Sequence, residues 1–241
     1  MRIPRIYTAQ GITPFSSVTL EEGASHHLIK VLRMQPGREL LLFNNSGSEF
    51  PATIEHATKK VATLAIGEER AIDRESPLIT ELAISISRGD RFDWVLQKAT
   101  ELGVTRIIPL FSERTEVKLN AERLEKRRQQ WQKIIIGACE QCQRNRLPEF
   151  GPATSLDAYV KSCDSQYRFV LHHRASTTLS SLAAPASISL LIGPEGGLSD
   201  AEIQHAETQG FTPLTLGPRV FRTETAPIAA LSIFQSLWGD L

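Results

Sequence analysis

The sequence is poor in cysteine and has no long hydrophobic run. Three cysteines in 241 residues cannot all pair, which argues against a disulfide framework and indicates a reducing compartment. No apolar stretch approaches the ~20 residues that a membrane span needs. The first residues, MRIPRIYTAQ, lack the apolar core of a secretory signal. The sequence therefore predicts a cytoplasmic protein without membrane contact.

An excess of charge of either sign is also lacking. With 27 basic and 27 acidic residues, the composition gives no general sign of nucleic-acid binding. The charge is uneven locally, because the stretch from Lys118 to Arg146 holds eight basic and three acidic residues. A neutral protein can bind RNA when its basic side chains gather on one face, so RNA stays open as a partner.

The hydrophobic pattern changes at a polar segment, AIDRESP at 71–77, which we interpret as a linker. Before it, short apolar and β-branched segments separated by turn residues are typical of a small β-barrel. One short helix is expected from residue 25, with Ser25 as its N-cap. We therefore predict two domains, residues 1–72 and 77–241.

After the linker, apolar strands alternate with amphipathic helices. This alternation predicts an α/β domain with a largely parallel sheet. The helix at 91–103 has Gly103 just beyond its last turn, a position that favours glycine. Strands are expected at 81–87, 106–111, 167–173, 188–193 and 212–217, and helices at 91–103, 122–142, 199–210 and 225–239.

A glycine-rich loop, GPEGG at 193–197, follows one of these strands. Ser199 and Glu202 form an S-x-x-E capping box for the helix after it. Ligands of parallel sheets bind at loops in this position. A phosphate site is disfavoured, because no P-loop lysine follows the glycines and because Glu195 and Asp200 make the loop acidic. An acidic loop tolerates a cation better than an anion.

A second loop, at 217–225, joins the next strand to the final helix. Two loops at neighbouring strand ends would converge on one crevice lined by backbone N–H and C=O groups. Arg219 and Arg222 would be its few fixed positive charges. Glycine and proline after a strand often only turn the chain, so the spacing alone leaves a binding site and simple turns equally open.

Several motifs resemble one family. LLIGPEGGLSDAE at 190–202, with LGPRVFRTETAPIAAL at 216–231, is similar to the C-terminal signature of the SPOUT methyltransferases, which bind S-adenosylmethionine in a knotted loop. Other stretches resemble the branch of bacterial ribosomal RNA small subunit methyltransferase E, which methylates a uridine of 16S ribosomal RNA at ring nitrogen 3. They are MRIPRIY, HHLIKVLRMQPG, RGDRFDWVLQKATELGV, IIPLFSER and WQKIIIGACEQCQRN.

The resemblance implies a PUA-like β-barrel followed by an α/β domain with a deep trefoil knot near 190–228. It implies S-adenosylmethionine as cofactor, 16S ribosomal RNA or the small ribosomal subunit as substrate, and a homodimer, which the strongly apolar final helix also favours. The expected cofactor-binding residues are Leu171, His172, Ile192, Gly193, Pro194, Glu195, Gly196, Leu216, Gly217, Val220, Thr223 and Ala226.

Methylation of uracil at nitrogen 3 requires the loss of a proton, and the resulting anion spreads over the two flanking carbonyl oxygens. A planar arginine fork suits the stabilisation of those oxygens, and Arg222 is the expected residue. Glu224 is the expected proton acceptor, with Glu101 and Glu140 as open alternatives. The expected RNA-binding residues are Arg2, Arg5, Lys30, Arg33, Arg144 and Arg146.

Two rival readings stay open from the sequence. A non-catalytic RNA-binding module with a degenerate cofactor pocket would use the barrel and the basic helix alone. A nucleotide-binding hydrolase is disfavoured by the missing P-loop lysine. No metal is expected, because Cys139 and Cys142 lack the second pair of ligands that a structural zinc site needs.

Overall fold

The computed structural model of the chain describes residues 3–172 and 179–241. The contacts within it divide the chain into two compact units. The first comprises Met1–Glu75 and Ile136–Leu147, and the second Ser76–Ile135 and Pro148–Leu241. The predicted division at 72–77 did not include the segment Ile136–Leu147 in the first unit. Among the described residues, no helix is both long and apolar enough to cross a bilayer.

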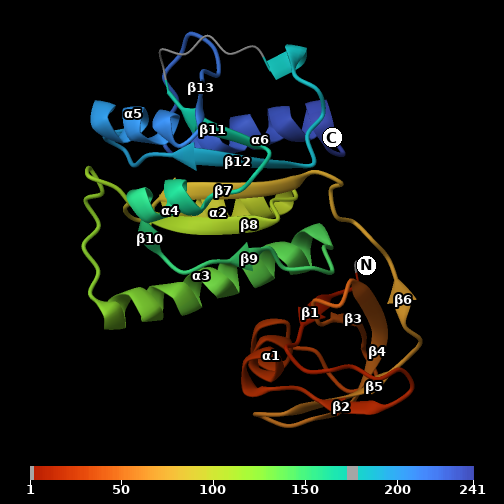
Figure 1. Cartoon of the computed structure of the whole chain (residues 1–241). Helices are drawn as coiled ribbons and strands as arrows, with labels where there is room; N and C mark the ends of the chain where they lie inside the picture. The colour runs from red at the N-terminus through yellow and green to blue at the C-terminus, as the bar shows by residue number, and fades with distance from the viewer. Residues whose placement is uncertain (1–2, 173–178) are drawn as a thin grey trace. The chain divides into compact units, whose positions relative to one another are not determined.

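The first unit is built on one six-stranded sheet (Figure 1). Alternate residues of its strands, such as Leu40, Leu42 and Ile54, are buried in a single core, as expected for a sheet with one dry face. The strand path runs from β1 to β2, and closure into a barrel stays a prediction. In order across the sheet, the strands are β1 (Arg5–Tyr7), β3 (Glu39–Phe43), β4 (Ser48–Ala57), β5 (Ala62–Ile66) and β2 (Ser17–Thr19), while β6 (Arg70–Ala71) pairs with β4.

The helix of this unit begins earlier than the sequence suggested. Helix α1 covers Glu22–His26, and a π-helical turn, His27–Val31, continues it. The prediction of Ser25 as N-cap is wrong, because Ser25 lies inside α1 and is buried. Its hydroxyl donates to the Leu20 carbonyl at 2.9 Å and accepts from the Ala62 N–H at 3.2 Å. The side chain thus satisfies buried backbone groups of the sheet instead of the helix start.

The segment Ile136–Leu147 completes the first unit through polar contacts with distant parts of the chain. The Asn145 side chain accepts from Arg5 at 2.5 Å and donates to the Ile72 carbonyl at 2.9 Å. The Leu147 N–H donates to the Asn45 side chain at 2.6 Å. These contacts join residues more than 70 positions apart, so this segment belongs to the first unit through its contacts and not through its position in the chain.

The second unit contains a seven-stranded sheet whose pairs are all parallel, which confirms the predicted α/β arrangement. The short strands β9 and β10 and helix α4 were not predicted. In order across the sheet, the strands are β10 (Thr154–Ser155), β8 (Arg106–Phe111), β7 (Ile79–Ser85), β12 (Ser187–Ile192), β11 (Tyr167–Leu171) and β13 (Thr212–Leu214), while β9 (Glu149–Phe150) pairs with β8.

Helices cover both faces of this sheet (Figure 1). On β7, Leu82 and Ile84 pack in one core with residues of α2, α3 and α6, whereas Ala83 packs in a second core with residues of α4 and α5. This is the three-layer arrangement that a buried parallel sheet requires. The helices are α2 (Arg91–Glu101), α3 (Ala121–Cys142), α4 (Leu156–Ser162), α5 (Asp200–Thr208) and α6 (Thr225–Trp238), with a 3-10 turn at Leu179–Ser181.

Candidate functional site

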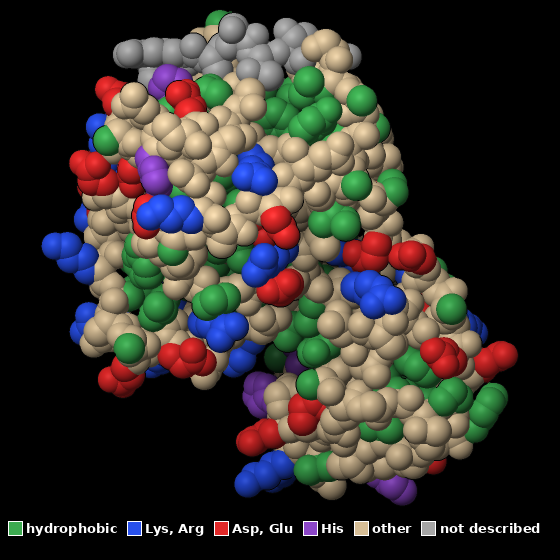
Figure 2. All heavy atoms as spheres, in the orientation of Figure 1, with side chains coloured by type: hydrophobic (Ala, Val, Ile, Leu, Met, Phe, Trp, Pro, Cys, Tyr) green, Lys and Arg blue, Asp and Glu red, His purple; other side chains and the backbone are tan. Residues whose placement is uncertain are grey.

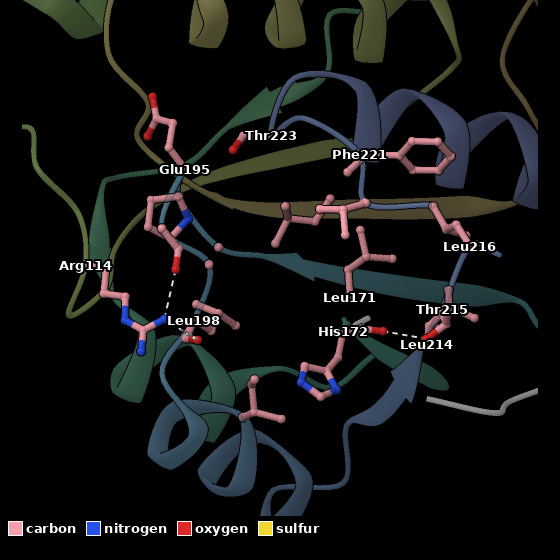
Figure 3. A pocket seen from close by; sticks show the side chains of 18 of the residues that line it. Arg114, Leu171, His172, Glu195, Leu198, Leu214, Thr215, Leu216, Phe221 and Thr223 are labelled. Atoms are coloured by element: carbon pink, nitrogen blue, oxygen red, sulfur yellow. Dashed lines mark hydrogen bonds between the residues drawn. The ribbon is translucent and has the colours of Figure 1, made fainter. Parts of the chain in front are cut away.

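A cavity of about 470 Å³ lies at the carboxyl ends of β11, β12 and β13 (Figure 3). Because these strands are parallel, their following loops meet at one edge of the sheet. We call residues 193–199 the glycine loop and residues 215–224 the final loop. Both loops contribute residues to the lining, as expected for the crevice that the sequence predicted between them.

All twelve expected cofactor-binding residues line this cavity. The structure thus brings them together, and their contact with a cofactor stays a prediction. Arg219, expected as a positive charge of the crevice, also lines it. Sequence reasoning did not assign the other lining residues, which are Arg114, Gly197, Leu198, Asp200, Ile203, Leu214, Thr215 and Phe221.

Gly193 is required by the fold of the glycine loop itself. A Cβ atom at this position would lie 2.7 Å from the Leu198 backbone nitrogen and 2.9 Å from the Gly197 carbonyl carbon. At Gly193 the loop's own backbone therefore fills the space that a side chain would occupy. Gly197, with a φ of +68°, provides the left-handed turn that folds the loop back.

Arg114 braces the glycine loop from the segment after β8. Its guanidinium donates to the Gly196 carbonyl at 2.8 Å and to the Leu198 carbonyl at 3.3 Å. The capping box of α5 is confirmed, and the Glu202 carboxylate also accepts the Glu113 N–H at 2.7 Å. Sequence spacing gave no signal for this brace, because β7 lies between β8 and β12 in the sheet.

His172 connects the ends of two strands on the other wall of the cavity. Its N–H donates to the Leu214 carbonyl at 2.9 Å, and its own carbonyl accepts from the Thr215 hydroxyl at 2.5 Å (Figure 3). These bonds extend the pairing of β11 with β13 into the loops. They therefore fix the backbone on which Leu216 and Gly217 stand.

The carboxylate of Glu195 points away from Leu171 and His172 (Figure 3). It accepts the Arg88 N–H at 3.1 Å and an Arg91 guanidinium N–H at 3.0 Å. Burial acts to raise the pKa of Glu195, but hydrogen bonds from its own N–H, from Arg88 and from Arg91 outweigh it, so the pKa lies below its ordinary value. The negative charge of the loop is thus partly neutralised by the protein.

Known proteins match the chain along its whole length. A family model described as an RNA methyltransferase domain matches residues 74–235, and one described as an RNA methyltransferase PUA domain matches residues 20–66. The "Ribosomal RNA small subunit methyltransferase E" of Buchnera aphidicola from Schizaphis graminum is 36% identical, over 100% of this chain and 98% of the relative. The chain belongs to the ribosomal RNA small subunit methyltransferase E family.

Two solved structures resemble this family member closely. A methyltransferase from Legionella pneumophila, in complex with S-adenosylmethionine, superposes with a TM-score of 0.98 at 45% identity, over 100% of both chains. The ribosomal RNA small subunit methyltransferase E of Neisseria gonorrhoeae, bound to S-adenosylmethionine, superposes with a TM-score of 0.92 at 38% identity, again over 100% of both chains. The PUA-domain match lies within the first unit, and the RNA methyltransferase match covers most of the second.

The two expected catalytic residues of this family member lie beside the cavity and not together in it. Arg222 is exposed and does not line the cavity, and its carbonyl accepts the N–H groups of Thr225 and Ala226 at 2.9 and 3.0 Å at the start of α6. Glu224 lines a second hollow, where its carboxylate lies 3.8 Å from the Arg91 guanidinium. Their catalytic roles stay predictions.

The other two candidate carboxylates have protein partners. Glu101 forms an ion pair with Lys98 at 2.9 Å on α2. Glu140 belongs to the first unit and accepts the Tyr7 N–H at 3.0 Å. Burial raises the pKa of Glu140 above its ordinary value. Neither residue lines either of the two hollows, so Glu224 is the better-placed acceptor among the three.

Two of the six expected RNA-binding residues are buried, which corrects that expectation. Arg5 forms an ion pair with Glu49 at 2.5 Å and lies 4.9 Å above the Phe43 ring. Arg144 forms an ion pair with Glu75. Both arginine side chains are 5% exposed or less, so they hold the first unit together and are not available to phosphate groups.

Lys30, Arg33 and Arg146 are exposed and stay candidates for RNA contact, while Arg2 lies outside the described residues. Arg33 has a φ of +52°, an uncommon backbone angle for a residue other than glycine. Figure 2 shows basic and acidic side chains interspersed over the visible face. That face carries no large patch of one sign, so RNA binding there would rely on individual residues.

The Cys139–Cys142 pair on α3 belongs to the first unit. Cys139 is buried and its thiol donates to the Arg146 carbonyl at 3.7 Å. A hydrogen bond with Cys142, together with burial, raises the pKa of Cys139. None of the three cysteines forms a disulfide. Within residues 3–172 and 179–241, no cluster of three His, Cys, Asp or Glu residues could hold a metal ion.

Proposed function

We propose that this chain is an S-adenosylmethionine-dependent methyltransferase that methylates ring nitrogen 3 of a uridine in 16S ribosomal RNA. The main support for this proposal is the cavity at the ends of β11, β12 and β13, where the glycine loop and the final loop meet. The near-identical folds of two S-adenosylmethionine-bound methyltransferases support the cofactor. The family membership supports the small-subunit ribosomal RNA as substrate.

The cavity fits this cofactor in size and in chemistry. Its volume of about 470 Å³ is in the range of pockets that enclose small ligands, roughly 300–1,000 Å³. Backbone groups of the glycine loop and of the final loop suit the hydrogen-bonding edge of a neutral adenine. Leu171, Ile192 and Leu216 supply an apolar wall. S-adenosylmethionine supplies a methyl group bound to a positively charged sulfur. That charge activates the methyl group, so no residue of the chain needs to do so.

The chain's own residues must hold the uracil and take its proton. Arg222 is exposed, and among the described residues its side chain has no ion-pair partner, so its guanidinium is available to a base at the mouth of the cavity. There it would stabilise the negative charge that develops on the uracil oxygens. The Glu224 carboxylate would accept the proton from nitrogen 3 as the nitrogen–methyl bond forms.

Transfer of labelled methyl groups tests this proposal. Purified protein is incubated with unmodified 16S ribosomal RNA and, separately, with small ribosomal subunits, and the modified nucleoside is identified by mass spectrometry. We expect the labelled methyl group on ring nitrogen 3 of a uridine. Methyl on another atom or another base would overturn the proposed reaction.

Replacement of Arg222 tests its role. We expect Arg222→Ala to lower the turnover number by roughly a hundred- to a thousandfold, as for loss of one preorganised donor, with little change in cofactor affinity. Lys161→Ala, which removes an exposed basic residue on α4 that does not line the cavity, is the matched control and should behave as wild type. A single-turnover rate for Arg222→Ala within about twofold of wild type would remove Arg222 from the mechanism.

A non-catalytic RNA-binding module is not favoured, since a degenerate pocket would not keep all twelve expected lining residues. Calorimetry with S-adenosylmethionine separates the two functions, because an adaptor should not bind it.

Finer features of the fold and location are proposed with this function. The PUA unit would close into a barrel, and the chain near 190–228 would form the trefoil knot around the two cavity loops. We keep residues 1–72 and 77–241 as the proposed domains. An RNA substrate and cysteines without disulfides favour the cytoplasm.

A homodimer is proposed through α6. This helix exposes Ile233 and Leu237 at 38% and 43%, and Leu241 follows at 68%. Its opposite face, with Leu231 and Phe234, is fully buried in the core of the same unit. A helix that is apolar on both faces is typical of one that packs on two sides, and a second copy would cover the outer one.

A further inference from the structure

A second hollow, of about 800 Å³, lies next to the cofactor cavity in the same unit. The two share Glu195 as a lining residue. Most of the second hollow comes from the loop after β7 and the first turn of α2. The parallel strands β7 and β12 are neighbours in the sheet, so both hollows lie at the same carboxyl edge. The lining residues are Arg88, Gly89, Asp90, Arg91, Trp94, Glu116, Glu195 and Glu224.

Trp94 is the unusual member of this lining. It is 40% exposed, whereas Phe92, Val95 and Leu96 of the same helix are 1% exposed or less. Trp94 faces away from Phe92 and Leu96, because each is two positions away and two positions along a helix correspond to about 200° of rotation. The large ring therefore contributes little to the core of this unit. Such exposed aromatic rings are typical of binding surfaces.

Two arginines share this lining with four carboxylates, and one of the arginines is held only by a surface ion pair. Arg88 pairs with Glu116 at 2.9 Å, but both side chains are more than half exposed. Surface pairs of this kind contribute little free energy, so Arg88 can exchange Glu116 for a phosphate group at small cost. Arg91 bridges Glu195 and Glu224 at 3.0 and 3.8 Å. This bridge ties the glycine loop to the final loop on the side that faces the hollow.

An exposed aromatic face beside arginines is the chemistry that recognises an unpaired nucleotide. Unstacked bases of RNA stack on aromatic side chains while basic residues contact the backbone. An enzyme that modifies a base must also take that base out of its stack. The shared residue Glu195 places this hollow within reach of the cofactor cavity, and Glu224, the expected proton acceptor, lines it.

We propose that this hollow binds the target uridine, with its base stacked on Trp94 and its phosphate held by Arg88. This inference rests on the proposed function and names the residues that receive its substrate. A second copy of the chain covering Trp94 is the competing occupant. Six of the eight lining residues are charged, which argues against it, because the centres of protein interfaces are depleted of charged residues.

Variants of Trp94 test the stacking role. We expect Trp94→Ala to weaken binding of the substrate RNA by roughly 5- to 150-fold, the range for loss of one base–aromatic stack. Trp94→Phe keeps an aromatic face and should bind within about fivefold of wild type. Calorimetry should give wild-type affinity of Trp94→Ala for S-adenosylmethionine. Light scattering should give the wild-type oligomeric state.

The phosphate contact has its own matched control. Arg88→Ala should weaken RNA binding and reduce its dependence on salt concentration, since fewer counterions are released. Lys161 forms a similarly exposed ion pair with Asp157 and lines neither hollow. Lys161→Ala should therefore leave the RNA affinity and its salt dependence unchanged. Equal effects of the two substitutions would remove Arg88 from the site.

Photo-crosslinking locates the base directly. RNA carrying 4-thiouridine at the methylated position is irradiated with the wild-type protein, and the linked peptide is identified by mass spectrometry. We expect the peptide that contains Trp94. Crosslinks that exclude this peptide, RNA affinity of Trp94→Ala equal to wild type, or a loss of binding that accompanies a change of oligomeric state would each overturn the inference.

The proposed function can fail separately. If wild-type protein transfers no methyl group to RNA, the reaction is wrong, while binding and crosslinking at Trp94 would still report the nucleotide site.

Discussion

Single residues decide whether the glycine loop can adopt its shape. Gly193 has no room for a side chain, and Arg114 holds the carbonyls of Gly196 and Leu198 from the segment after β8. The loop is thus held in its shape by contacts within the protein. Its open backbone groups are therefore positioned before a ligand arrives, which lowers the cost of ordering them on binding.

Substitution at Gly193 should weaken cofactor binding. We expect Gly193→Ala to lower the affinity for S-adenosylmethionine by at least about tenfold, because the new methyl group must displace the Leu198 backbone, and core overpacking typically costs 1–3 kcal/mol. Calorimetry measures the affinity. Gly137→Ala is the control, since a Cβ there meets no atom within 4 Å and Gly137 lines neither hollow. Similar affinities of the two variants would contradict the steric argument.

The buried arginines mark the limit of sequence reasoning at this scale. A cluster of basic residues in the sequence shows where positive charge is concentrated along the chain. It does not show whether those side chains are buried or exposed in the fold. Arg5 was expected at the RNA, yet its partners Glu49 and Asn145 are 44 and 140 positions away. Only the fold brings those groups together. By contrast, the resemblance to the family supplied the expected cavity-lining residues, and the direction of parallel strands indicated only that their loops would converge.

At the scale of elements, the two helices that start with a serine N-cap differ in what they support. Ser199 caps α5 directly after the glycine loop, and Glu202 completes its capping box. Ser155 caps α4, and its side chain accepts the Ala158 N–H at 3.2 Å. A serine N-cap therefore occurs at α5, beside the cavity, and at α4, which does not line the cavity.

This pair separates stability from binding. We expect Ser199→Ala and Ser155→Ala each to lower the free energy of unfolding by about 0.5–2 kcal/mol, the usual cost of a lost N-cap. Only Ser199→Ala should also weaken S-adenosylmethionine binding, because it loosens the exit of the glycine loop. Denaturant unfolding and calorimetry measure the two effects. A cofactor affinity that falls equally in both variants would indicate a general loss of folding.

Element length explains what the sequence could predict. Helices of 9 to 22 residues, such as α3 and α5, gave clear periodicity or caps. Strands of two residues, such as β6, β9 and β10, are too short for any period to show. Helix α4 has seven residues and was missed for the same reason. The missed elements lie mainly at sheet edges, so their omission left the order of the long strands intact.

At the scale of the whole molecule, the outer face of α6 makes the oligomeric state testable. We expect light scattering to report a dimer at micromolar concentration. Leu237→Asp should shift it toward monomer, because a buried unpaired carboxylate is costly at an apolar interface. Val61→Asp, which changes an exposed apolar residue of the first unit at 40% exposure, should leave the dimer intact. A wild-type monomer would contradict the proposed pairing.

The membership of Ile136–Leu147 in the first unit has a consequence for protein synthesis. Domains generally fold as they emerge, starting from the N-terminus. Here residues 1–75 leave the ribosome about seventy residues before Asn145, the partner that Arg5 requires. During that interval the Arg5 guanidinium lacks the Asn145 side-chain oxygen that accepts its hydrogen bond. The N-terminal unit therefore reaches its final form only when more than half of the polypeptide has been translated.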